Sequence, residues 1–168
     1  CEIEMGGFVR DVPRNKVSTL DPRSVRQLQT GGMTGGDRMI HHGYSNYYSK
    51  YLKRFLEEEI NLVILECGIL KGSGLAIWSK LFPNSKIIGL DIDLSYIRAN
   101  LKNLKKRGAF KERDPKLIEF DQFNPDVKEL KNILDGQKID IAIDDGFHSN
   151  ICIINTFIAL KELMASNY

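Results

Sequence analysis

The sequence has little of what several classes of protein require. Its three cysteines, Cys1, Cys67 and Cys152, form no Cys-x-x-Cys pair and leave an odd count, which argues against a disulfide framework and against a cysteine-rich zinc site. No apolar run approaches the roughly 20 residues that span a bilayer, and the N-terminus lacks a signal-peptide core. A formal charge of +2 at pH 7 is small for a protein held to nucleic acid by phosphate contacts. We therefore expect a cytoplasmic protein that binds neither membranes nor nucleic acid, with Cys67 and Cys152 as small core residues.

Apolar segments of strand and helix type alternate along the chain. With 168 residues, 42% of them apolar and 27% charged, the chain is large enough for one globular core. Strands are predicted at 61–67, 86–91, 117–121 and 138–144, and helices at 45–59, 74–82, 94–107, 125–134 and 149–165. This alternation predicts an α/β fold of the Rossmann-like, doubly wound type, in which helices cover both faces of a parallel sheet. Ligands of such sheets bind at the carboxyl ends of the strands.

Local signals mark the ends of several of these elements. Asp21-Pro22 predicts the start of a short helix over 24–29. Ser95 and Ser149 are predicted N-caps, and Gly108 is a predicted helix stop. We expect two parts in the chain: residues 1–59 as an N-terminal extension with a helical lid segment, and residues 60–168 as a cofactor-binding domain.

A glycine-rich turn joins the first predicted strand of that domain to its helix. Glycines at 68, 72 and 74 allow the backbone to come close to a ligand, and the helix that follows presents unpaired N–H groups to anything negative. Asp91, at the end of the next strand, stands where a carboxylate can accept hydrogen bonds from both hydroxyls of a ribose. The combination predicts a cofactor that contains adenosine.

The class of cofactor depends on Glu66. Dinucleotide-binding turns usually begin with glycine at that position and continue as Gly-x-Gly-x-x-Gly or Ala. Glu66-x-Gly68-x-x-x-Gly72-x-Gly74 instead resembles motif I of class I S-adenosylmethionine-dependent methyltransferases, which commonly has glycine where this chain has Leu70. A nicotinamide-dependent oxidoreductase stays open as an alternative, because it shares the strand, the glycine turn, the helix and the acidic strand end.

A second group of polar residues follows the fourth predicted strand. Asp144 and Asp145 are adjacent, and His148 follows after a glycine. Neighbouring carboxylates repel each other unless a cation or hydrogen-bond donors stabilise them, so the pair indicates a divalent metal or a charged ligand. The imidazole can accept a proton near neutral pH. In the alternative interpretation the aspartates are solvated or cap the next helix, and His148 lies on the surface.

Several motifs occur together in this sequence. They are Asp37-Arg-Met-Ile-His-His-Gly-Tyr44, Glu66-Cys-Gly-Ile-Leu-Lys-Gly-Ser-Gly74, Trp78, Phe82-Pro83-Asn84, Gly89-Leu-Asp91 and Asp144-Asp-Gly-Phe-His148. Their combination resembles the macrolide sugar O-methyltransferases of the macrocin and mycinamicin type, to which cephalosporin hydroxylase-like sequences are related. The similarity runs from about Gly35 to the end of the chain.

The resemblance implies a role for each candidate residue. Asp145 would be a ligand of Mg²⁺, and His148 would be the general base. Asp91 would hold the ribose of S-adenosylmethionine, and Asp121 would lie beside the adenosine. The remaining cofactor-binding residues would be Glu66, Gly68, Gly72, Gly74 and Asp144.

The resemblance also implies a segment that covers the active site. His41, His42 and Tyr44 would lie on it, although the family has Asp-Lys where this chain has Asp37-Arg38. A complete domain of this class has more strands than the four predicted here, so we expect a fold truncated after its fourth strand and the following helix. Family members take further metal ligands from an acidic pair after the next strand.

The expected activity is therefore metal-assisted methyl transfer from S-adenosylmethionine to a hydroxyl group. The acceptor would be a sugar or another small natural product, such as a glycosylated antibiotic precursor. A nicotinamide-dependent oxidoreductase and a non-catalytic cofactor-binding fragment stay open as alternatives. Because an open sheet edge invites pairing, we also expect either a homo-oligomer or further chain that covers it.

Overall fold

A computed structural model of the protein describes residues 8–9, 33–34, 44–57 and 60–166. The helix predicted over 24–29 lies outside these residues, and so do His41 and His42. Two short strands, β1 (Phe8–Val9) and β2 (Met33–Thr34), pair in antiparallel fashion.

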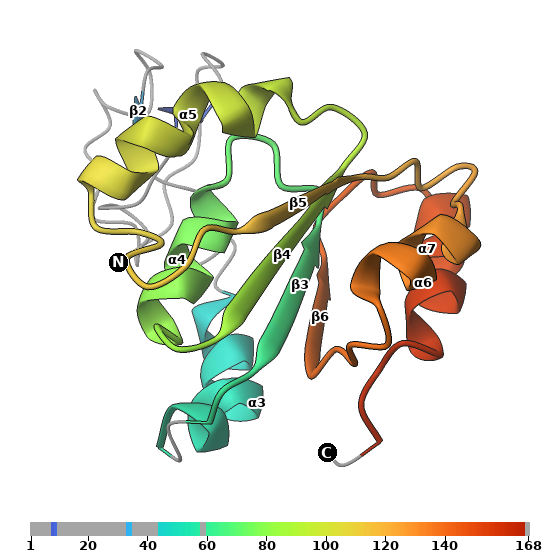
Figure 1. Cartoon of the computed structure of the whole chain (residues 1–168), viewed down its shortest axis with the longest axis horizontal. Helices are drawn as coiled ribbons and strands as arrows, with labels where there is room; N and C mark the ends of the chain where they lie inside the picture. Colours follow the sequence, from blue (N-terminus) through green and yellow to red (C-terminus); the bar gives the residue numbers. More distant parts are fainter. Residues whose placement is uncertain (1–7, 10–32, 35–43, 58–59, 167–168) are drawn as a thin grey trace.

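A parallel sheet forms the centre of the fold (Figure 1). Its strands are β3 (Val63–Cys67), β4 (Lys86–Asp91), β5 (Lys116–Glu119) and β6 (Ile141–Asp144). They lie in the order β5-β4-β3-β6, so the first strand of the sheet in sequence is in its interior and pairs on both sides. This order brings the end of β6 next to the end of β3, although about 75 residues separate them along the chain.

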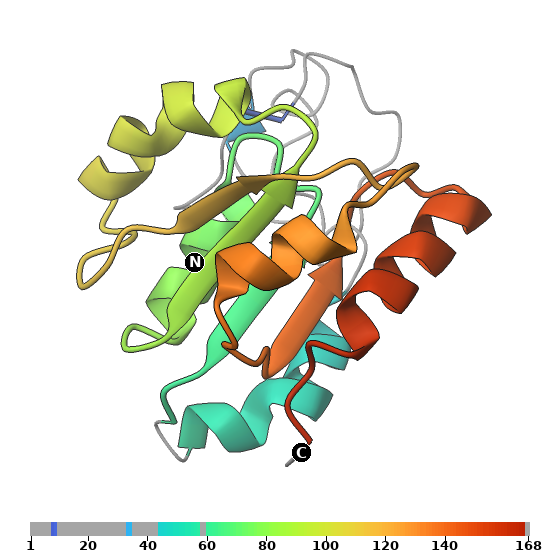
Figure 2. The same ribbon diagram turned by 45° about the vertical axis from the view of Figure 1, so that its right-hand side comes forward.

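Helices cover both faces of this sheet, as the alternation of segments predicted (Figure 2). One buried cluster joins one face of the sheet to α3 (Ser45–Glu57), α4 (Ser73–Leu81) and α5 (Ser95–Lys106). A second cluster joins the other face to α6 (Val127–Leu134) and α7 (Asn150–Lys161). The doubly wound, Rossmann-like arrangement is thereby confirmed. Of the helices described, none is both long enough and apolar enough to cross a membrane.

Helix α3 packs on the core of the sheet domain. Its Phe55 is buried in the same cluster as Leu62 and Trp78, and Tyr48 and Leu52 pack against that cluster. The helical part of the predicted lid segment thus shares the hydrophobic core of the domain, and the boundary after residue 59 otherwise stays a prediction.

Several predicted element ends differ from the observed ones because of contacts with distant residues. The Asp140 carboxylate accepts a hydrogen bond from the Val63 N–H at 2.7 Å, and the Asp140 N–H donates to the Val63 carbonyl at 3.0 Å, whereas the paired residues of β6 begin at Ile141 and not at residue 138. Helix α7 ends at Lys161 and not at residue 165. Beyond it the chain turns back beside Ile139, which donates its N–H to the Leu163 carbonyl at 2.9 Å.

One of the two predicted caps is confirmed. The Ser149 hydroxyl accepts a hydrogen bond from the Cys152 N–H at the start of α7. Ser95, in contrast, is the first residue of α5, and its N–H donates to the Asp93 carboxylate at 2.8 Å. The hydrogen bonds from Ser95 hold the pKa of Asp93 below its usual value.

A buried carboxylate joins β3 to α4. Glu66 is 0% exposed, and the indole N–H of Trp78 donates to its carboxylate. Trp78 is also fully buried, and the ring of Tyr48 meets it edge-on with the ring centroids 5.1 Å apart. A strand and two helices therefore meet at one polar contact inside an apolar cluster, where an unpaired acceptor is costly.

We expect the Trp78→Phe variant to be less stable than the wild type by about 1–3 kcal/mol in free energy of unfolding, because the buried Glu66 carboxylate loses a donor. Urea unfolding followed by far-ultraviolet circular dichroism measures the difference, since Trp78 is the single tryptophan of the chain. Tyr47→Phe, at an exposed position of α3, is the matched control, with a change below about 0.5 kcal/mol. Equal stability of wild type and Trp78→Phe would show that this hydrogen bond contributes nothing.

Candidate functional site

A cleft with a volume of about 430 Å³ lies at the carboxyl ends of the parallel strands. We call it the central cleft. It is lined by residues that follow β3, β4, β5 and β6, namely Cys67, Gly68, Leu70, Asp91, Ile92, Phe120, Asp121, Gln122, Phe123, Asp145, Gly146 and Phe147. Ligands of doubly wound sheets bind at this edge, next to the point where neighbouring strands connect in opposite directions.

The loop after β3 lies directly against the loop after β6. Gly68 has a φ of +81°, and a Cβ atom at this position would overlap the main chain of Asp145 and Gly146. The Asp145 N–H donates to the Cys67 carbonyl at 2.9 Å, which extends the contact between the strands into the loops. Only glycine allows this backbone conformation and this close approach together.

Asp91 holds the glycine turn against the end of β4. One carboxylate oxygen accepts hydrogen bonds from the N–H groups of Ile69 and Leu70, at 2.9 and 2.8 Å, and the other accepts from Asp93 at 3.1 Å. The carboxylate therefore stabilises the turn and lines the central cleft at the same time. The predicted contact with a ribose stays a prediction.

Asp121 shapes the loop after β5 in a similar way. Its carboxylate accepts from the Phe123 N–H at 2.8 Å, and its carbonyl accepts from the Asn124 N–H at 3.2 Å. This turn ends the strand and places Phe123 beside Phe147, with ring centroids 5.5 Å apart. Asp121 lines the central cleft, as its predicted place beside an adenosine requires.

The wall of the central cleft carries apolar side chains that water reaches. Leu70, Ile92, Phe123 and Phe147 are all more than half exposed, and each comes from a different loop. Exposed apolar groups that converge on one cavity are typical of a ligand site, because a bound apolar surface removes them from water. A flat purine base has the shape and the apolar faces to do this.

The acidic loop after β6, Asp144–His148, turns its two aspartates in different directions. Asp144 accepts from the side-chain amide of Gln122 at 3.0 Å and from the Gly146 N–H at 3.1 Å. Asp145 lines the central cleft, whereas Asp144 and His148 do not. His148 is exposed, as the surface interpretation of this loop required.

Four of the predicted site residues line the central cleft, and five do not. Gly68, Asp91, Asp121 and Asp145 line it. The side chain of Glu66 is instead buried against Trp78 on the α4 face of the sheet, so its carboxylate does not reach the cleft. Gly72 lies under α5, where a Cβ atom would overlap the side chain of Ile97, and Gly74 is buried in α4. These two glycines serve helix packing. Asp144 and His148 are the other two predicted residues that do not line the central cleft.

The sequence did not indicate that Gln122 would hold the acidic loop or that Cys67 would line the central cleft. Gln122 is 8% exposed and makes hydrogen bonds with the acidic loop and with α7. The one available signal was its position directly after Asp121 at a strand end. Cys67 is buried, as predicted for a core residue, but it also forms the floor of the central cleft. Burial, and then the charges of Asp144 and Asp91, raise the pKa of the Cys67 thiol well above its usual value.

The acidic loop carries the residue that was predicted to bind a metal ion, Asp145. Among residues 44–57 and 60–166, no three His, Cys, Asp or Glu side chains gather closely enough to hold a metal ion. Mg²⁺ is often bound by one or two carboxylates together with water and substrate oxygens, so Asp145 fits as one ligand. One oxygen of Asp144 is already engaged by Gln122 and Gly146.

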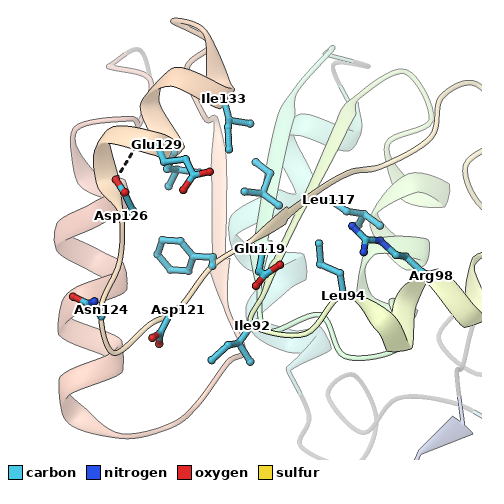
Figure 3. Close-up of a pocket in the computed structure, with 13 residues that line it drawn as sticks. Ile92, Leu94, Arg98, Leu117, Glu119, Asp121, Asn124, Asp126, Glu129 and Ile133 are labelled. Carbon is cyan, nitrogen blue, oxygen red and sulfur yellow. Dashed lines mark hydrogen bonds between the residues drawn. The ribbon is translucent and has the colours of Figure 1, made fainter.

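A second cleft lies along the edge strand β5, between α5 and α6 (Figure 3). Its volume is about 510 Å³, and its acidic lining includes Glu119, Asp126 and Glu129. Asp126 caps α6 by accepting from the Glu129 N–H at 2.9 Å. None of the residues of the glycine turn lines this cleft, although it shares Ile92, Phe120 and Asp121 with the central cleft. The candidate site is therefore the central cleft.

The fold and this cleft define an α/β protein with a doubly wound parallel sheet and a cleft at its carboxyl edge. Among curated proteins, L-olivosyl-oleandolide 3-O-methyltransferase from Streptomyces antibioticus is 27% identical over 125 residues. Among solved structures, the MycE methyltransferase from the mycinamycin biosynthetic pathway, in complex with Mg and SAH, superposes with a TM-score of 0.52 at 24% identity. No protein-family model matches the chain.

These matches confirm the resemblance to macrolide sugar O-methyltransferases and the Rossmann-like fold that the motifs predicted. The match to the curated relative covers 69% of this chain, and the match to MycE covers 76% of it. The chain spans less than a third of the length of these relatives, 28% and 30% respectively.

We expect Gly68→Ala to lower the free energy of unfolding by about 3 kcal/mol, because the new methyl group adds a main-chain overlap to the backbone strain. Gly136→Ala is the matched control: Gly136 has a similar φ of +74°, but no atom lies within 4 Å of its Cβ position. Backbone strain alone should cost this control about 1 kcal/mol. Urea unfolding measures both. If the two variants lose the same stability, the close approach of Gly68 to the acidic loop does not constrain the fold.

Proposed function

We propose that the chain binds S-adenosylmethionine in the central cleft and belongs to an enzyme that methylates a hydroxyl group of a sugar or another small natural product. The observation that supports this most directly is that Gly68, Asp91, Asp121 and Asp145, from four separate loops, line one cavity. Similarity to an O-methyltransferase for a glycosylated compound supports the reaction type and the class of acceptor.

Each part of the cofactor has matching chemistry in the cleft. The exposed faces of Ile92 and Phe123 suit the adenine ring, and Asp91 would accept hydrogen bonds from the ribose hydroxyls. The main chain at Gly68 presents no side chain to the ligand, so the amino-acid part could lie against the turn. Asp91 on the cleft wall would favour a positively charged sulfonium group.

The acidic loop would supply the groups that activate the acceptor. An alcohol is a weak nucleophile at neutral pH, and Mg²⁺ would supply Lewis-acid chemistry that lowers the pKa of a hydroxyl group. Asp145 would hold that ion with oxygens from water and the acceptor. His148, three residues further along the same loop, would take the proton of the acceptor hydroxyl, while S-adenosylmethionine supplies the methyl group. A complete metal site would need protein ligands beyond Asp145.

A nicotinamide-dependent oxidoreductase is the main rival, because it would use the same sheet edge. The similarity to an O-methyltransferase and the lack of a Gly-x-Gly-x-x-Gly or Ala pattern favour the methyltransferase. A non-catalytic cofactor-binding fragment would bind the same ligand without turnover. A cytoplasmic location and self-association, both expected from the sequence, stay predictions.

Titration calorimetry of this chain with S-adenosylhomocysteine and with NAD separates the two cofactor classes. We expect binding of S-adenosylhomocysteine and a loss of roughly tenfold in its affinity in Phe123→Ala, since stacking of a base on an aromatic ring contributes about 1–3 kcal/mol. Phe157→Ala is the control. Phe157 is 67% exposed, compared with 55% for Phe123, but it lies on α7 and does not line the central cleft. Stronger binding of NAD, or equal losses in both variants, would contradict the proposal.

Turnover tests the acidic loop. With Mg²⁺ and the glycoside L-olivosyl-oleandolide as acceptor, we expect Asp145→Ala and His148→Ala in the intact protein to reduce formation of S-adenosylhomocysteine by roughly 100-fold or more. Cofactor affinity should change by less than about threefold, because neither change removes a contact to the adenosine. Glu112→Ala, an exposed change outside the central cleft, is the control. Undiminished methylation in both variants would refute these roles.

A further inference from the structure

The carboxamide of Gln122 is engaged at both of its ends. Its nitrogen donates to the Asp144 carboxylate at 3.0 Å and to the Thr156 hydroxyl at 2.7 Å. Its oxygen accepts from the Phe147 N–H at 2.7 Å. One side chain from the loop after β5 therefore joins the loop after β6 to α7, at a position that is 8% exposed.

Packing places this carboxamide directly against the acidic loop. A Cβ atom at Gly146 would overlap the Gln122 carboxamide on one side, and a Cβ atom at Gly68 would overlap Gly146 on the other. The acidic loop is thus held between the glycine turn and Gln122. The main chain of Gln122 is itself fixed, because the Asn155 side chain of α7 donates to its carbonyl at 3.0 Å.

The chemistry of the partners selects glutamine. A carboxylate accepts hydrogen bonds and a main-chain N–H donates them, so the residue between Asp144 and Phe147 must carry a donor and an acceptor side by side. Glutamic acid in its ionised form would place a second negative charge beside Asp144, and an apolar residue would leave buried polar groups unpaired. Only one orientation of the amide satisfies all three partners.

We propose that Gln122 is a positioning residue that holds the acidic loop Asp144–His148 in the conformation in which Asp145 faces the central cleft. Its direct neighbours Asp121 and Phe123 line the end of the cleft that suits the adenosine. Occupation of that end therefore stabilises Gln122 and, through it, the acidic loop. The catalytic meaning of this coupling rests on the proposed function, whereas the positioning of the loop does not.

Amide hydrogen exchange of Gly146 and Phe147, measured by nuclear magnetic resonance, tests the positioning. In Gln122→Met we expect both amides to exchange roughly tenfold faster than in the wild type, because the loop loses its polar partners. Gln122→Glu should show the same effect at about pH 8, where the introduced carboxylate repels Asp144. Gln137→Glu is the control, because it makes the same change of charge in the turn between α6 and β6, and should leave both amides unchanged.

The coupling between the central cleft and the acidic loop can be measured in the wild-type protein, so this part of the test does not depend on the folding of any variant. Saturating S-adenosylhomocysteine should slow exchange of the Phe147 amide, and this effect should be lost in both Gln122 variants. Unchanged exchange of Gly146 and Phe147 in the variants, or equal loosening in Gln137→Glu, overturns the positioning role. Ligand binding in the wild type without any slowing at Phe147 overturns the coupling. If the wild type binds no S-adenosylhomocysteine, the proposed function fails, and the exchange rates of the variants still decide the role of Gln122.

Discussion

The close approach of two loops, at Gly68 after β3 and Gly146 after β6, is the constraint on which the rest of the site depends. It exists because β6 pairs directly with β3 in the sheet, so that both loops leave the same edge. A side chain at Gly68 would overlap the main chain of Asp145 and Gly146 and force the two loops apart, whereas a side chain at Gly146 would overlap the carboxamide of Gln122. With both positions reduced to main chain, Asp145 and Asp91 line one cleft at the carboxyl edge, where ligands of doubly wound sheets bind.

The carboxylates around this edge are stabilised in different ways. These differences distinguish the carboxylates that hold the fold together from the one that is proposed to bind a metal ion. Glu66 is buried against an indole N–H and serves the core. Asp91 and Asp121 accept hydrogen bonds from main-chain N–H groups, and they thereby stabilise the turns beside the central cleft. Asp144 is exposed but accepts a hydrogen bond from the Gln122 side chain, so one of the two adjacent aspartates is engaged by another side chain and the other lines the cleft. A metal ion is therefore not needed to explain the stability of Asp144, and the metal proposal depends on Asp145.

The proposed methyltransferase would account for more of the site than an oxidoreductase would. Both would use the glycine turn and the acidic end of β4, but only the methyltransferase proposal assigns a role to the acidic loop after β6, the activation of a hydroxyl acceptor. The apolar side chains of Ile92, Phe123 and Phe147, exposed in the central cleft, provide the surface for a purine in either case. The discriminating chemistry therefore lies in the loop Asp144–His148, which Gln122 and Gly68 hold in place.

The sequence by itself determined the fold class, the strands and helices of the sheet domain, and the contribution of Gly68, Asp91, Asp121 and Asp145 to one edge, because periodicity and strand ends are local properties. It could not decide which loops touch, since that depends on the pairing of β6 with β3 across about 75 residues. It also did not predict the burial of Glu66 against Trp78 of α4, and it placed the end of α7 too late, because beyond Lys161 the chain turns back and the Leu163 carbonyl accepts from the Ile139 N–H. Gln122 became visible only in the tertiary structure, because all of its side-chain partners lie more than 20 residues away in the sequence.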